Sequence, residues 1–129
     1  MAPAKSVAWV ETHVGTLRQA RALARLALRA RLAACANLWP LESAYWWRGW
    51  LEEGREVRVV LKSAPRRVRA LLALVRDAHP YEVPYIAWGE RERVTPAYAA
   101  WVAPEPAPPR TRRGPRGTSR AKPGTRRRT

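Results

Sequence analysis

Residues 44–62 read AYWWRGWLEEGREVRVVLK, and this stretch decides the fold class. Aromatic residues crowd its first part, residues 44–51, which predicts a β-strand. Glu52-Glu53-Gly54 predicts a turn, because glycine accepts the positive φ that tight turns require. Apolar and polar residues alternate over Glu56–Lys62 and predict a second strand. The two strands together predict a long β-hairpin.

The residues before residue 44 predict the first strand of the chain, a helix and the beginning of the hairpin's first strand. A short apolar run, Ala33–Leu38, predicts a buried strand that Pro40 interrupts and that resumes at Ala44. The β-branched and aromatic segment Ser6–Thr12 predicts the first strand of the chain. Between them, Thr16 is expected to cap an amphipathic helix that ends near Arg31.

The residues after the hairpin predict a second helix, a last strand and a short final helix. Ser63 is expected to cap the second helix, whose apolar stripe is Val68, Leu71, Leu72 and Val75. Pro80 ends it, because proline disfavours helix in the residue before it. The last strand is expected over Val83–Trp88, and Pro96 is expected to open a helix over Ala97–Val102.

The resulting order is strand, helix, strand, strand, helix, strand and a short helix. This is the ferredoxin-like βαββαβ pattern, an α+β fold. Right-handed crossovers place both long helices on one face of a four-stranded antiparallel sheet. We expect one such domain over residues 1–102, followed by a separate segment over 103–129.

Composition indicates a cytoplasmic protein with a basic tail. The chain has 129 residues, a formal net charge of +15 and a single cysteine, Cys35, which suits a reducing compartment. Its first residues lack the apolar stretch of a secretory signal, and no apolar run predicts a membrane span. Residues 103–129 are rich in proline, glycine and arginine, so we expect a disordered tail. Such a tail predicts weak, nonspecific nucleic-acid binding through Arg112, Arg113, Arg126, Arg127 and Arg128.

The aromatic residues of the hairpin predict self-association. If residues 44–51 form one strand, its side chains alternate between the two faces of the sheet. Two helices cover only one face, and a large exposed apolar area is a liability for a monomer. A closed ring of subunits is therefore expected, unless the tail or the last helix covers the bare face. The two sets are Trp46, Arg48 and Trp50 on one face, and Tyr45, Trp47 and Leu51 on the other.

Four motifs give the chain a family resemblance. They are RLAACAN at 31–37, YWWRG at 45–49, HPYEVP at 79–84, and Pro96-Ala97-Tyr98 with Trp101. In this order and spacing the chain resembles the CutA divalent-cation-tolerance family. The resemblance implies a ferredoxin-like homotrimer associated with tolerance of copper and other divalent cations. It also implies an architecture like that of the trimeric PII signalling proteins, which bind small ligands between subunits.

The resemblance also implies candidate site residues. His79 and Glu56 match family residues linked to copper, and Thr12 stands where some members carry a cysteine ligand. We therefore expect a site for copper(II) or another divalent cation at His79, Glu56 and Thr12, with the soft thiolate missing. His13 is set aside as a substitute, because adjacent strand residues face opposite sides. The alternative is that His79 only stabilises a helix terminus.

Other residues are candidates for a ligand cleft rather than for catalysis. Arg48, Tyr81, Tyr98 and Trp101 are expected to line any cleft between subunits, by architectural analogy. Cys35 lies in an apolar strand and is expected to be an inert core residue. Two histidines and one cysteine suggest no catalytic triad, and no glycine-rich phosphate loop is present. We therefore do not expect an enzyme.

Overall fold

The computed structural model describes residues 6–104, and the expected order of strands and helices is confirmed. The tail arginines Arg112, Arg113, Arg126, Arg127 and Arg128 lie outside the described residues. None of the described helices is long and apolar enough to cross a membrane. The elements are β1 (Ser6–Val14), α1 (Leu17–Arg29), β2 (Cys35–Trp47), β3 (Trp50–Ser63), the 3-10 turn η1 (Pro65–Arg67), α2 (Val68–Ala78), β4 (Ile86–Arg93) and α3 (Pro96–Val102).

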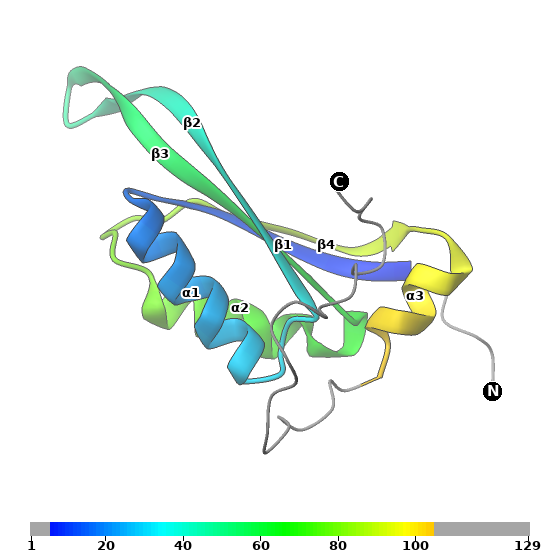
Figure 1. Cartoon of the computed structure of the whole chain (residues 1–129). Coiled ribbons are helices and arrows are strands. Elements are labelled where there is room, and N and C mark those ends of the chain that lie inside the picture. Colours follow the sequence, from blue (N-terminus) through cyan, green and yellow to red (C-terminus); the bar gives the residue numbers. More distant parts are fainter. Residues whose placement is uncertain (1–5, 105–129) are drawn as a thin grey trace, which may run out of the picture.

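The four strands form one antiparallel sheet in the order β2-β3-β1-β4. Figure 1 shows α1 and α2 side by side along one face of this sheet, with the hairpin of β2 and β3 extending beyond it. The core lies between the sheet and these helices, as the ferredoxin-like pattern predicts. Its fully buried side chains include Val10, Val14, Val59, Leu61, Leu71 and Val75.

The start of α1 is fixed by a capping box, which confirms Thr16 as its N-cap. The Thr16 hydroxyl accepts the backbone N–H of Gln19 at 3.1 Å, and the Gln19 side chain accepts the N–H of Thr16 at 3.2 Å. These bonds satisfy amide groups that have no partner inside the helix. The buried face of α1 is Ala20, Leu23, Ala24 and Ala27.

The hairpin turn lies earlier in the chain than expected. Trp47 pairs with Trp50, so the turn residues are Arg48 and Gly49, with φ of 51° and 86°. Two successive positive φ values match the twist of the flanking strands. The expected turn at Glu52-Glu53-Gly54 is wrong, because Gly54 is a strand residue of β3.

The expected break at Pro40 is also wrong, because β2 runs through this residue. Within the part of the chain that the structure describes, β2 is an edge strand with β3 as its only neighbour. The missing N–H of a proline is tolerated there, since an edge strand leaves half of its backbone groups outside the ladder.

The corrected turn changes which aromatic residues share a face. Trp46 pairs with Leu51 across the hairpin, and Trp47 pairs with Trp50. Directly paired residues lie on the same face, so Trp47 and Trp50 share one face and Trp46 and Leu51 the other. The expected grouping of Trp46 with Trp50 is wrong, but aromatic side chains still occupy both faces.

Three smaller boundaries differ from the expectation. Ser63 does not cap α2; it ends β3, and its hydroxyl donates to the Leu32 carbonyl at 2.6 Å. α2 instead follows η1. The last strand begins at Ile86 rather than at Val83, because residues 79–85 form an irregular connection that contains two prolines.

Candidate functional site

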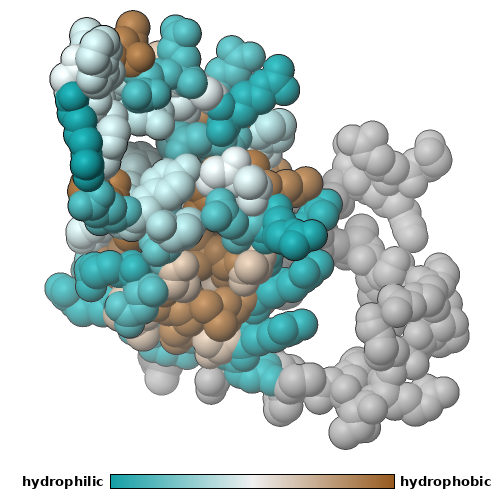
Figure 2. Space-filling view, turned by 90° about the vertical axis from the view of Figure 1, so that its left-hand side faces the viewer, coloured by the Kyte–Doolittle hydropathy of each residue, from teal (hydrophilic) through white to brown (hydrophobic). Residues whose placement is uncertain are grey.

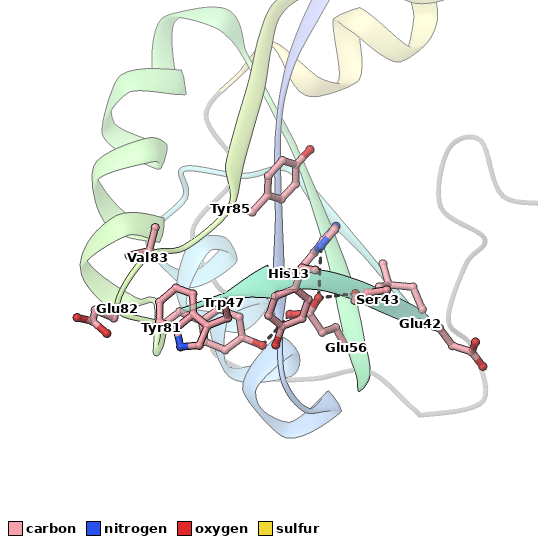
Figure 3. Close-up of a pocket in the computed structure, with 12 residues that line it drawn as sticks. His13, Glu42, Ser43, Trp47, Glu56, Tyr81, Glu82, Val83 and Tyr85 are labelled. Carbon is pink, nitrogen blue, oxygen red and sulfur yellow. Dashed lines mark hydrogen bonds and ion pairs between the residues drawn. The ribbon is translucent and has the colours of Figure 1, made fainter. Parts of the chain in front are cut away.

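A cleft lies where the hairpin meets the connection between α2 and β4. Its volume is about 900 Å³. Figure 3 shows side chains from β1, β2, β3 and the connection around it. Its lining includes His13, Ser43, Trp47, Glu56, Tyr81 and Tyr85.

Strand register brings the polar residues of the cleft together. Glu56 pairs with Leu41, and the next residue but one, Arg58, pairs with His13. Since side chains alternate, Glu56, Arg58 and His13 lie on the face of the sheet opposite α1 and α2. We call this the open face. The intervening Val57 and Val59 are buried in the core.

Glu56 accepts side-chain hydrogen bonds from two other residues of the cleft. The Ser43 hydroxyl donates to its Oε1 at 2.6 Å, and the Tyr81 hydroxyl donates to its Oε2 at 2.8 Å. Burial and the neighbouring Glu56 carboxylate raise the pKa of Tyr81 well above its usual range. Tyr81 therefore stays protonated as the donor and ties the α2–β4 connection to the hairpin (Figure 3).

His13 lies between two carboxylates. Its Nδ1 is 3.8 Å from Glu56, and its Nε2 is 3.6 Å from Glu11. The Glu11 carboxylate also accepts a 2.6 Å hydrogen bond from Arg58. The Tyr85 ring packs on the imidazole with centroids 4.8 Å apart. His13 is the cleft residue that sequence reasoning set aside. His13 shares a face with Glu56 because of the register between β1 and β3, which the local sequence does not specify.

His79 acts as a connector at the end of α2. Its Nδ1 accepts the N–H of Tyr81 at 3.1 Å, so the proton of the neutral ring is on Nε2. That Nε2 lies 2.9 Å from the His13 carbonyl and 2.8 Å from the Thr12 hydroxyl. Burial lowers the pKa of His79, which favours this neutral form.

The residues expected to hold a metal ion do not form one coordination site. His79 and Thr12 meet, but the lone pair of the neutral His79 ring already accepts the Tyr81 amide. The Thr12 hydroxyl donates to the Tyr85 carbonyl at 2.6 Å and lies on the buried face of β1, whereas Glu56 lies on the open face.

His13 does not complete such a site either. Glu11 and Glu56 approach opposite nitrogens of its ring, so a single ion cannot bind both carboxylates and the imidazole. Among residues 6–104, no group of three or more histidine, cysteine, aspartate and glutamate side chains is arranged to hold a metal. As they are placed within residues 6–104, His79, Thr12, Glu56 and His13 therefore do not fit a resident metal ion.

The expected ligand-cleft residues divide into two groups. Tyr81 lines the cleft. Arg48 does not line it but lies next to it, forming a 3.0 Å ion pair with Glu82 and lying over the Trp47 ring. Tyr98 and Trp101 belong to α3 and do not line the cleft. Figure 1 shows α3 at the end of the sheet away from the hairpin tip.

Tyr98 instead contacts the only cysteine. Its hydroxyl is 3.7 Å from the Cys35 sulfur, and burial raises the pKa of Tyr98 above its usual range. Cys35 is half-buried on the open face rather than enclosed in the core.

Comparison with known proteins identifies the family. The model of the CutA1 divalent ion tolerance protein family matches residues 8–105. The divalent-cation tolerance protein CutA of Thermococcus kodakarensis is 37% identical over 84 residues, which is 65% of this chain and 81% of that protein. Protein CutA of Mus musculus is 42% identical over 84 residues, which is 64% of this chain but only 48% of the mouse protein.

Solved structures agree with the sequence comparison. CutA from Synechococcus elongatus PCC7942 superposes with a TM-score of 0.72 at 28% identity, covering 78% of this chain and 90% of that one. CutA1 from Pyrococcus horikoshii superposes with a TM-score of 0.70 at 32% identity, covering 74% and 93%. The ferredoxin-like sheet, the hairpin and the matched motifs together show that this chain belongs to the CutA1 divalent ion tolerance family.

Proposed function

We propose that this protein serves divalent-cation tolerance as a non-catalytic homotrimer, and that the cleft is its ligand site. The observation that carries the proposal is the convergence of His13, Ser43, Glu56 and Tyr81 on one hollow of about 900 Å³. Polar groups converging in a cleft with apolar walls are typical of small-molecule sites.

The lining of the cleft suggests the chemistry of its ligand. Its walls are aromatic, with Tyr45, Trp47, Tyr81 and Tyr85, and none of the lysines or arginines of residues 6–104 lines it. The Glu56 carboxylate lies at its centre with a side-chain exposure of 14%. A small molecule with a flat apolar body and a hydrogen-bond donor fits such walls better than an anion does.

The hairpin supports the trimer. Trp46 and Trp50 near its tip are 74% and 73% exposed, and Leu51 is 57% exposed. Burying a tryptophan removes on the order of 150–250 Å² from water, which stabilises an assembly by a few kcal/mol for each residue. A closed ring of three subunits, as the family resemblance implies, buries these side chains without leaving a free edge.

The role of the cation follows from the failed fit at His79, Thr12 and Glu56. We infer that tolerance of copper(II) or another divalent cation operates through the ligand cleft and not through a resident ion held by these three residues. The single cysteine of the chain supports a cytoplasmic location, where thiols stay reduced.

The test is a binding titration on the full chain. An aromatic amine such as tyramine is the first probe, because its ammonium group suits Glu56 and its ring suits Trp47. We expect Glu56→Gln to weaken binding about tenfold or more, since a charged hydrogen bond is lost. The matched control is Tyr98→Phe, which removes a partly buried hydroxyl outside the cleft.

Two results would contradict the proposal. One is equal affinity in the wild type and in Glu56→Gln, with circular dichroism showing both folded. The other is stoichiometric copper(II) binding that His79→Ala abolishes, which would restore the ion site. Native mass spectrometry of the same samples measures the subunit number, and a monomer would contradict the trimer.

A further inference from the structure

The charged residues of the described chain are segregated between two faces. Residues 17–31 and 65–78, which contain α1, η1 and α2, form what we call the helical face. Asp77 is its only acid, whereas the rest of residues 6–104 has eight glutamates against six basic residues. The helical face carries Arg18, Arg21, Arg25, Arg29, Arg31, Arg66, Arg67, Arg69 and Arg76.

Four of these arginines form a straight stripe along α1. Arg18, Arg21, Arg25 and Arg29 are all exposed. At 3.6 residues per turn they fall within an arc of about 80°, and at 1.5 Å per residue they extend over about 16 Å. The apolar side of the helix packs on the sheet, so the stripe faces away from it.

The stripe has no acidic partners. No salt bridge within residues 6–104 involves Arg18, Arg21, Arg25 or Arg29, and α1 has no acid in its first turn. Exposed arginines of the hairpin have acids near them: Arg48 forms an ion pair with Glu82, and Arg55 pairs across the hairpin with Glu42. The stripe of Arg18, Arg21, Arg25 and Arg29 is therefore a positive surface without compensating acids among residues 6–104.

We propose that the helical face binds the phosphate backbone of nucleic acid without reading its sequence. The α1 stripe extends over about 16 Å. One strand of a DNA duplex carries roughly five phosphates over the same length of duplex axis. Arginine donates to phosphate oxygens in a bidentate manner and keeps its charge at all physiological pH values. The sheet and the hairpin are on the other side of the molecule (Figure 1), so the surface stays accessible in an assembly built through them.

The arrangement favours nucleic acid over an anionic membrane. A helix that lies in a membrane surface inserts an apolar face into the lipid, but the apolar face of α1 is used in the core. The exposed leucines of α1 lie on the two sides of the stripe, about 80–100° around the helix from Arg18. They are Leu17, Leu26 and Leu28. Figure 2 shows an apolar patch in the middle of one face of the molecule, with hydrophilic side chains around it.

The experiment compares two full-length variants with equal net charge. Arg18, Arg21 and Arg25 are changed to Gln in one variant, and Arg55, Arg91 and Arg93 in the other. Fluorescence anisotropy measures the affinity of each for a 20-base-pair DNA duplex between 50 and 200 mM NaCl. Because each phosphate contact contributes about 0.9 to the slope of log K against log salt, the first variant should lose about 2–3 units of slope and bind more weakly at 100 mM by about a hundredfold or more. The control variant should keep the wild-type slope.

Each contrary outcome overturns the proposal. Equal weakening of both variants would mean that only overall charge matters. No weakening of either would place binding in residues 105–129. If the wild-type protein binds vesicles containing phosphatidylserine but does not bind the duplex, the helical face is a membrane-binding surface. Circular dichroism of both variants establishes that they are folded.

Discussion

His79 illustrates how one residue can look like a metal ligand in the sequence and serve as a connector in the fold. Both of its ring nitrogens are engaged, with the Tyr81 amide on one side and the His13 carbonyl on the other. We expect His79→Ala to lower the free energy of unfolding by about 1–3 kcal/mol, because buried polar partners lose their hydrogen bonds. Urea denaturation measures this loss.

The control for this prediction is His79→Gln, whose amide can retain one of the two bonds and should lose less. A loss of copper(II) affinity without any loss of stability would contradict the connector role.

The lowered pKa of His79 also predicts a pH dependence. The unfolded chain binds a proton near the ordinary histidine pKa of about 6.5, whereas burial holds the folded pKa lower. The unfolded state therefore binds more protons as pH falls, and stability decreases from about pH 7 downward until the folded pKa is passed. Urea denaturation at pH 7.5 and pH 5 should show a smaller difference for His79→Gln than for the wild type. An equal difference in the two proteins would show that His79 does not contribute.

At the scale of the element, the hairpin turn offers a direct comparison of two glycines. Gly49 has φ of 86°, where a Cβ is strained, whereas Gly54 is in an open part of β3 with no atom within 4 Å of a Cβ. We expect Gly49→Ala to destabilise the fold by about 1 kcal/mol. Gly54→Ala should change stability by less than about 0.5 kcal/mol, as open surface sites usually do. Thermal unfolding of the two variants measures both effects, and the reverse order would put the turn back at Gly54.

The same hairpin shows how far the sequence could predict the structure. The order of elements, the Thr16 cap and the helical stripes follow from local patterns, and these predictions are confirmed. The turn was misplaced because Glu52-Glu53-Gly54 and Arg48-Gly49 are both acceptable turn sequences, and only strand register distinguishes them. The predicted strand break at Pro40 is wrong for a similar reason, since the place of this residue on an edge strand is a property of the assembled sheet.

The candidate site was less predictable than the fold. Glu56 and Tyr81 were named from motifs, and both are at the cleft. Their meeting with His13 and Ser43 depends on how β1, β2 and β3 align, which no local pattern specifies. Tyr98 and Trp101 are on α3 and away from this cleft within one chain, so their expected place in a cleft between subunits stays a prediction.

At the scale of the whole molecule, the exposed hairpin tip predicts how the subunits associate. Trp46 and Trp50 lie on opposite faces of the hairpin and are more exposed than any other tryptophan in residues 6–104. Because the hairpin exposes a tryptophan on each of its two faces, both faces have to be covered, which requires more than one contact with neighbouring subunits. We therefore expect Trp46→Ser with Trp50→Ser to convert the proposed trimer to monomer, because on the order of 150–250 Å² of burial would be lost at each residue in every subunit. The measurement is size-exclusion chromatography with light scattering at micromolar concentration.

Trp88→Ser is the control, since this residue is 49% exposed on β4, away from the hairpin, and the variant should remain a trimer. If the double variant stays trimeric while the Trp88 variant dissociates, subunits associate through the β4 edge of the sheet and not through the hairpin.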